Sequence, residues 1–260
     1  QNTLDLVETN NDEKINQYEF VNYFSENIGE NDSLVVDGGG TNVYISYQAF
    51  KNKKNQRQIL STGLCSMGSG IPEAIGVVNA NKTGSVYCFV GDGSFYLNVQ
   101  ELKTLTENNI HLKIVVFNNG GYLSIKETQR EFLDSNFIGV SNSDPVDMKL
   151  LVEAFGLYYY SIKKSSELED NFEKFINQKK SSLLEVFVDD KQKVIPTQYF
   201  KKIQDKFEVQ PLENMAPPLE KKLYNSLIIN KNIINWKRLI YLYIILNPTE
   251  SFFIIKEENW

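Results

Sequence analysis

The chain has 260 residues, of which 42% are hydrophobic and 23% charged, a composition typical of a globular protein long enough to bury its own core. Its 33 acidic and 27 basic residues give a net charge of −6, which argues against nucleic-acid binding because that function usually requires a basic face. With one histidine, His111, and two cysteines, Cys65 and Cys88, the chain lacks the ligands for most zinc and iron–sulfur sites and for Ser-His-Asp catalysis, and we expect both thiols to be reduced.

The sequence predicts alternating helices and strands along residues 15–190. The strands are continuous apolar runs, which is typical of parallel strands covered by helices on both faces. The predicted helices are 15–29, with Gly29 as C-cap, 68–84, with Pro72 in its first turn, 98–109, with Asn98 as N-cap, 144–156 and 165–180. The predicted strands are 33–36, 85–90, 111–117, 157–162 and 182–188. The pattern predicts an α/β fold of three layers with a doubly wound, mostly parallel sheet.

The two ends of the chain lie outside this alternation. Residues 1–14 are predicted to be a linker from a missing upstream part, since the chain starts at Gln1 and its first methionine is Met67. Residues 191–222, rich in proline, are predicted to form an extended, irregular C-terminal segment, and 223–260 is a tail without assignment. The polar start is unlike a signal peptide, and the apolar run 239–246 is shorter than the roughly 20 residues that span a bilayer. We therefore expect a cytoplasmic protein with neither a membrane nor a nucleic-acid partner.

Three loops rich in Gly, Asn and Asp, at 37–42, 91–98 and 118–122, each follow a predicted strand. Because the carboxyl ends of parallel strands lie at one edge of a sheet, where ligands bind, we expect these loops to come together.

The second of these loops, in the stretch GDGSFYLNVQEL (91–102), has features of a phosphate site and of a metal site. Gly91 and Gly93 permit a sharp turn and a close approach to a ligand, and Ser94 opens a helix whose N–H groups favour phosphate. Asp92 would repel a phosphate unless both bind a divalent cation. Mg²⁺ fits, because it prefers oxygen ligands and is often shared with phosphates, and Asn118 and Asn119 can add a neutral amide oxygen.

These segments resemble a known family. GDG followed by an Asn pair, with Asn119 placed 27 positions after Asp92, resembles the thiamine-diphosphate-binding motif. GLCSMGSGIPEAIG (63–76) is similar to a stretch of acetolactate synthase-like enzymes, 91–122 resembles their metal and diphosphate segment, and NMAPPL (214–219) resembles their C-terminal segment. The resemblance covers about 15–220 and implies a thiamine-diphosphate-binding (PP) domain over 15–190.

The resemblance also implies residue roles. Asp92 and Asn119 would give side-chain oxygens to Mg²⁺, and Gly121 its backbone carbonyl. Met67 would support the bent cofactor, and the Cys65 carbonyl would accept a hydrogen bond from its aminopyrimidine. The diphosphate would be lined by Gly40, Thr41, Asn42, Gly93 and Ser94, and Gly91 and Tyr122 complete the predicted cofactor-binding set. DGGGTN (37–42) departs from the family's usual TGVGQH-like segment, and glycines replace more polar residues after the asparagines.

The function that the resemblance implies is a thiamine-diphosphate- and Mg²⁺-dependent lyase or transferase acting on a 2-oxo acid, by decarboxylation or acetolactate synthase-like carboligation. FAD, which some relatives use structurally, is not indicated. The family's catalytic glutamate belongs to a pyrimidine-binding domain that this chain does not match. We therefore predict no catalytic residue here, an inactive chain without that domain or subunit, and a homo-oligomer. Two alternatives stay open: a non-catalytic binding module that keeps the fold, and one subunit of a split 2-oxoacid decarboxylase.

Overall fold

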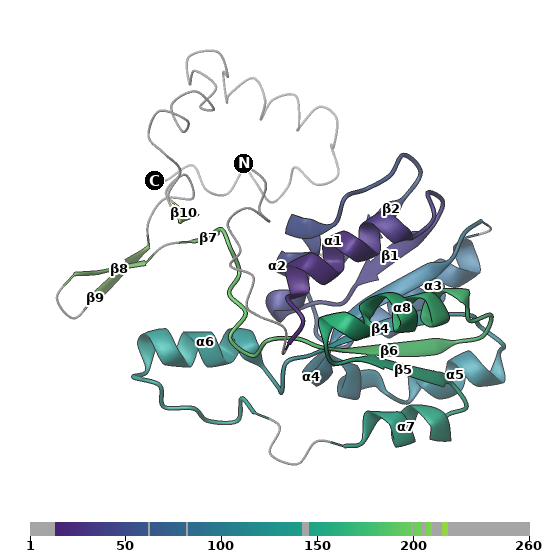
Figure 1. Ribbon diagram of the computed structural model, residues 1–260. Coiled ribbons are helices and arrows are strands. Elements are labelled where there is room, and N and C mark those ends of the chain that lie inside the picture. Colours follow the sequence, from purple (N-terminus) through teal and green to yellow (C-terminus); the bar gives the residue numbers. More distant parts are fainter. Residues whose placement is uncertain are drawn as a thin grey trace, which may run out of the picture. The chain divides into compact units, whose positions relative to one another are not determined.

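The computed structural model describes residues 14–61, 63–81, 83–141, 146–198, 200–203, 206–209 and 215–217 (Figure 1). The chain divides into two compact units, Gln1–Ile195 and Pro196–Trp260. Of the predicted linker only Lys14 is described, and the tail 223–260 lies outside the described residues. The division of the chain proposed from the sequence stays a prediction.

The first unit contains a six-stranded sheet in which every neighbouring pair of strands is parallel. All five predicted strands are present, and a short edge strand, β2, is added. In spatial order the strands are β2 (Arg57–Ile59), β1 (Ser33–Val36), β3 (Val86–Gly91), β4 (Lys113–Asn118), β6 (Ser182–Phe187) and β5 (Tyr158–Ile162). The predicted parallel α/β architecture is confirmed.

Helices cover both faces of this sheet, because successive residues of a buried strand point to opposite sides. In β3, Phe89 belongs to the core on one face, whereas Cys88 and Val90 belong to the core on the other. The first face is covered by α1 (Gln17–Asn27), α2 (Gly40–Ala49) and α8 (Leu168–Asn177). The second face is covered by α3 (Gly70–Ala80), α5 (Glu101–Glu107) and α7 (Met148–Ala154). The three layers are therefore helix, sheet and helix.

The position of α1 is fixed by an N-cap and by aromatic packing. The side-chain oxygen of Asn16 accepts hydrogen bonds from the backbone N–H groups of Tyr18 and Glu19, as expected of a good N-cap. The fully buried ring of Phe24 lies edge-on to Phe89 of β3, with ring centroids 4.7 Å apart. This contact holds α1 over the centre of the sheet.

Two predicted helix caps are wrong. Asn98 lies in the short 3₁₀ helix η2 (Tyr96–Asn98), and its side-chain amide donates to the Gly68 carbonyl at 2.7 Å instead of capping α5. Gly29 does not adopt the left-handed conformation of a C-cap glycine, because α1 ends in the extended residue Ile28 and the Gly29 N–H donates to Asp32.

Two helices at the carboxyl edge of the sheet were not predicted. Helix α2 begins inside the glycine-rich segment 37–42, which predicts a loop. Helix α6 (Leu123–Phe132) buries only Leu123, so it has no apolar stripe by which to recognise it. Between β3 and η2 the chain also forms a single helical turn, α4 (Asp92–Phe95), and η3 (Ser165–Glu167) precedes α8.

The second unit contributes two small antiparallel pairs among its described residues. β7 (Thr197–Gln198) pairs with β10 (Met215–Ala216), and β8 (Phe200–Ile203) pairs with β9 (Lys206–Val209). Across the described parts of both units, no helix combines the length and the apolar character needed to cross a membrane.

Candidate cofactor-binding site

A pocket lies where the strand order changes direction. The chain passes from β1 outward to β2 and then returns to β3 on the other side of β1, so the connections after β1 and β3 diverge. In parallel α/β sheets such a switch point leaves a crevice at the carboxyl ends of the strands. The residues that line it here are Gly39, Gly40, Thr41, Asn42, Met67, Gly91, Asp92, Gly93, Ser94, Phe117, Asn119, Gly121, Tyr122, Leu123, Ser124 and Ile125. The three predicted loops therefore meet in one pocket.

All but one of the predicted site residues line this pocket. The exception is Cys65, whose thiol accepts a hydrogen bond at 3.4 Å from the N–H of Gly39, a residue of the lining. Met67 does reach the lining and is 38% exposed. The sequence did not predict the contribution of the first turn of α6, Leu123, Ser124 and Ile125, because α6 itself was not predicted.

Asp92 lies at the end of β3, and its side chain is only 2% exposed. Its Oδ1 accepts a hydrogen bond from the Gly93 N–H at 3.0 Å, and its Oδ2 accepts one from the Gly121 N–H at 2.8 Å. Burial raises the pKa of Asp92 to about 6, although these backbone donors act in the opposite direction. A buried carboxylate with a raised pKa is the kind of group that a cation would stabilise in its ionised form.

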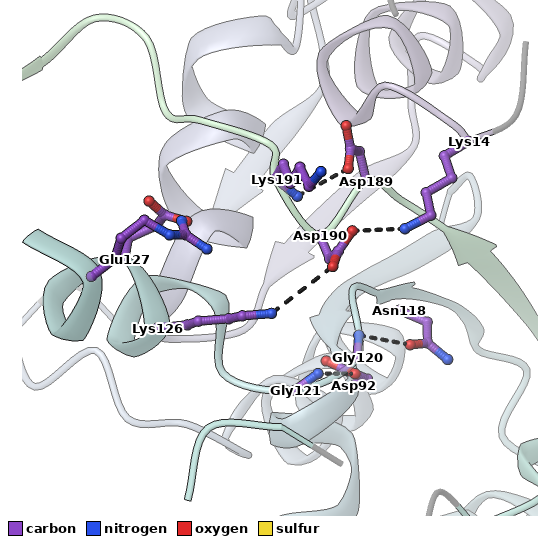
Figure 2. Close-up of polar contacts among 11 residues, drawn as sticks. Lys14, Asp92, Asn118, Gly120, Gly121, Lys126, Glu127, Asp189, Asp190 and Lys191 are labelled. Carbon is purple, nitrogen blue, oxygen red and sulfur yellow. Dashed lines mark hydrogen bonds and ion pairs between the residues drawn. The ribbon is translucent and has the colours of Figure 1, made fainter. Parts of the chain in front are cut away.

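The loop that carries Asn119 is held by its neighbour Asn118 (Figure 2). The Asn118 side chain accepts a hydrogen bond from the Gly120 N–H at 3.1 Å and donates one to Glu185 at 2.6 Å. Glu185 is buried in β6, and its other carboxylate oxygen accepts a hydrogen bond from the Tyr159 hydroxyl. This series of hydrogen bonds, from Tyr159 through Glu185 and Asn118 to Gly120, connects the pocket loop to β5 and β6. Asn118 therefore has a positioning role.

Asn119 presents an oxygen that suits a metal ion. Its Oδ1 is buried and accepts no hydrogen bond within the part of the chain that the structure describes. A buried acceptor without a partner costs stability unless something binds it. Among the described residues no group of three or more His, Cys, Asp or Glu side chains is placed to hold a metal. The Asp92 carboxylate and the Asn119 amide oxygen fit Mg²⁺, which needs only one or two protein oxygens when phosphates supply others.

Two glycines are required by the shape of the pocket. Gly121 has φ +134°, and a Cβ there would lie 2.4 Å from the Val140 carbonyl oxygen. A Cβ on Gly93 would lie 2.5 Å from the Tyr122 ring. The backbone contact and the positive φ exclude a side chain at Gly121, whereas a side chain at Gly93 would require the Tyr122 ring to move.

The first turn of α2 supplies further backbone donors. Gly40, Thr41 and Asn42 form this first turn. The N–H groups of a first turn have no hydrogen-bond partner inside the helix, and they form the positive end of the helix dipole. The side-chain amide of Asn42 donates to the Phe89 carbonyl at 3.1 Å and so ties α2 to β3.

Asp37 is a functional candidate that the sequence reasoning missed. It follows β1 directly and is fully buried, and its Oδ1 accepts a hydrogen bond from the Gly70 N–H at the start of α3, at 2.7 Å. Burial raises the pKa of Asp37, while the Gly70 amide and the Ser94 hydroxyl lower it. Asp37 thereby joins the loop after β1 to the segment that carries Met67. The sequence feature that could have identified Asp37 is an acidic residue directly after a predicted buried strand.

An ion pair connects α6 to the segment that follows β6 (Figure 2). The Asp190 carboxylate accepts a hydrogen bond from Lys14 at 2.7 Å and lies 3.9 Å from the Lys126 ammonium of α6. The hydrogen bond from Lys14 is the main cause of the lowered pKa of Asp190. These contacts are partly exposed and add modestly to the placement of α6.

Comparison with known proteins identifies the family to which the domain with this pocket belongs. A family model described as "Thiamine pyrophosphate enzyme, C-terminal TPP binding domain" matches residues 37–186, which include every residue that lines the pocket. The chain is 27% identical over 182 residues to the acetolactate synthase isozyme 1 large subunit of Escherichia coli (strain K12), covering 70% of this chain and 32% of that protein.

Two further relatives give the same result. The chain is 30% identical over 165 residues to the isozyme 2 large subunit of Escherichia coli (strain K12), covering 64% of this chain and 30% of that protein. It is 30% identical over 168 residues to the acetolactate synthase large subunit of Lactococcus lactis subsp. lactis (strain IL1403), covering 64% and 29%. The chain spans about a third of the length of these relatives. It belongs to the thiamine pyrophosphate enzymes, as a C-terminal TPP-binding domain distantly related to that of acetolactate synthase large subunits.

Proposed function

We propose that this chain is the diphosphate- and magnesium-binding half of a thiamine-diphosphate-dependent enzyme that acts on a 2-oxo acid. The observation that carries the proposal is that the buried Asp92 carboxylate lines one pocket together with Asn119, whose Oδ1 has no hydrogen-bond partner among the described residues, and with the first turn of α2. A magnesium ion shared with a diphosphate needs these ligands. The relatives' name, acetolactate synthase, supports decarboxylation or carboligation as the reaction class.

In this proposal each part of the pocket has a separate task. Asp92 and Asn119 hold Mg²⁺ through side-chain oxygens, and Gly121 adds its carbonyl. Ser94 and the first turn of α2 donate hydrogen bonds to the diphosphate. Met67 supports the cofactor from below. When bound, thiamine diphosphate supplies the electron sink for carbanion chemistry, and the chain fixes its position.

The pKa of Asp92 links metal binding to pH. A cation favours the ionised carboxylate, so Mg²⁺ lowers the raised pKa of Asp92 and its binding releases a proton below pH about 6. Mg²⁺-dependent cofactor binding should therefore weaken as the pH falls through 6.

The proposal includes a second protein part that completes the site: a pyrimidine-binding domain or subunit carrying the catalytic glutamate. Asp92 is the one acidic residue among those that line the pocket, and it is assigned to the metal. Apolar side chains are exposed around the pocket: Met67 and Ile125 in its lining are 38% and 46% exposed, and Leu97, which contacts Gly68, is 53% exposed. Exposed apolar groups gathered at one place favour a surface that a partner covers. We also propose that the complete protein self-associates, which sedimentation of the full-length protein can test.

Calorimetric titration with thiamine diphosphate tests the half-site. We expect binding in Mg²⁺, no binding in EDTA, and a loss of at least about tenfold in affinity in Asp92→Ala, because loss of even an outer-shell partner of a metal ligand typically costs about 10–100-fold. Asp170→Ala, which removes an exposed acid from the first turn of α8, is the matched control and should bind like the wild type.

The titration also separates the alternatives. If the chain alone does not bind, the experiment is repeated with the upstream domain or subunit present, and absence of Mg²⁺-dependent binding there would contradict the proposal. Cofactor binding by the completed assembly without turnover of any 2-oxo acid would favour the non-catalytic module. Activity that requires a separately encoded partner would favour the split 2-oxoacid decarboxylase.

A further inference from the structure

A second cavity lies at the opposite edge of the sheet, where the strands begin. It has a volume of about 220 Å³ and is formed by the starts of β3 and β4, the end of α3 and the segment after α8. β3 has six residues, so at about 3.3 Å per residue this cavity is roughly 20 Å from the cofactor pocket. Among its lining residues are Asn81, His111, Lys113, Lys179 and Lys180.

The cavity is lined by cationic and hydrogen-bond-donating side chains. Lys113, Lys179 and Lys180 contribute to its wall together with His111, and no Asp or Glu is among its lining residues. Within the described part of the chain, none of these three lysines forms a salt bridge. This concentration of like charge stands out in a chain whose net charge is −6.

Lys113 is the buried member of the group, with 7% of its surface exposed. Its ammonium donates to the carbonyls of Phe175 and Gln178, each at 2.7 Å, and so caps the carboxyl end of α8. Burial and the neighbouring charge of Lys179 lower the pKa of Lys113 to about 8, while Asp32 acts weakly in the opposite direction. These two hydrogen bonds use two of the three N–H groups of the ammonium, which also lies 5.2 Å from the centroid of the Phe175 ring.

Asn81 supplies an independent observation. Its side-chain oxygen accepts a hydrogen bond from the Thr83 N–H, but its Nδ2 is buried and donates to no partner among the described residues. A buried amide donor without an acceptor is costly. Helix capping by Lys113 accounts neither for this donor nor for the charges of Lys179 and Lys180. An anion in the cavity would balance the charges of Lys179 and Lys180.

The geometry points to a binding site for a small oxyanion, of the size and charge of phosphate or of a metabolite's phosphate group, in this cavity at the amino edge of the sheet. The oxygens of such an anion accept hydrogen bonds from ammonium and amide donors, and its charge relieves the repulsion between the lysines. The cavity volume exceeds the roughly 30 Å³ of one water molecule several-fold, so a phosphate fits.

His111 provides the measurement, because it is the single histidine of the chain and lines this cavity. We would follow its ring signals by NMR while inorganic phosphate is added at constant pH and ionic strength, with chloride as the reference salt. The expected result is a saturable shift of one set of signals. Shifts that chloride reproduces, or that do not saturate, would overturn the proposal.

A pair of double variants tests which lysines hold the anion. Lys179→Gln with Lys180→Gln should weaken phosphate binding by about tenfold or more, since charge-assisted hydrogen bonds are lost. The control is Lys163→Gln with Lys164→Gln, which removes the same charge from two consecutive exposed lysines that follow β5 at the other edge of the sheet. It should leave the affinity for phosphate within about twofold of the wild type. Equal weakening by both would mean that only net charge matters and would also overturn the site.

Discussion

Replacing Asp92 with asparagine should stabilise the metal-free protein at neutral pH, although it removes a proposed metal ligand. The pKa of the carboxyl rises from 3.8 to about 6 because folding buries it. A group whose pKa is raised on folding contributes stability that is fully present below pH about 4 and is lost as the pH rises through about 6. A shift of roughly 2 pKa units corresponds to about 3 kcal/mol.

The net effect is smaller than this, because the asparagine amide replaces one carboxylate oxygen with a donor. Either the Gly93 or the Gly121 N–H then loses its acceptor, at a cost of about 1 kcal/mol. We therefore expect Asp92→Asn to be about 2 kcal/mol more stable than the wild type at pH 8. For a domain of this size that is a rise of roughly 4–8 °C in Tm.

The assay is denaturant or thermal unfolding in EDTA at several pH values between 4 and 8. The wild type should lose stability relative to Asp92→Asn across this range, and saturating Mg²⁺ with thiamine diphosphate should reverse the order. Asp190→Asn is the control of opposite sign, because the pKa of Asp190 is lowered and its contribution is lost as the pH falls. A stability difference between Asp92→Asn and the wild type that does not change with pH would refute the reasoning.

Three further substitutions separate ligand, positioning and backbone roles. Asn119→Ala should raise the free energy of unfolding of the metal-free protein by about 1 kcal/mol, since it removes a buried acceptor that has no partner among the described residues, but it should weaken Mg²⁺-dependent cofactor binding at least about tenfold in calorimetry. Glu185→Leu leaves the Asn118 amide and the Tyr159 hydroxyl unpaired and should cost about 2–4 kcal/mol in urea unfolding, with Glu185→Gln restoring part of it. Gly121→Ala should cost about 2 kcal/mol or more and lower cofactor affinity, because its φ of +134° and the nearby Val140 carbonyl both exclude a Cβ.

Elements whose extent follows from local sequence were predicted well, whereas the roles of the site residues stay predictions. The strands are continuous apolar runs ended by polar residues, so the amino-acid pattern alone predicts their extents and the meeting of the loops that follow them. Asp92 and Asn119 belong to those loops, and the parallel sheet brings them to one pocket.

The residues that were missed depend on packing. Helix α6 buries one side chain and is placed by α2 and by the pair Lys126–Asp190, none of which leaves a periodic pattern in the sequence. The role of Asp37 depends on its contact with Gly70, which is 33 positions further along the chain. Glu185 lies in an apolar strand, and its contact with Asn118 joins residues 67 positions apart.

The hydrogen bond between Glu185 and Asn118 determines when, during folding, the protein can bind its cofactor. Strand β6 is the last strand of the sheet in the chain, yet it lies between β4 and β5. The loop that carries Asn119 therefore receives its Glu185 anchor only when β6 enters the sheet. A nascent chain that has been synthesised through β4 and Gly121 contains every proposed metal ligand, but their positions are not yet fixed. Cofactor affinity should thus report on the completion of the fold, so that a chain truncated before β6 is left without an ordered site.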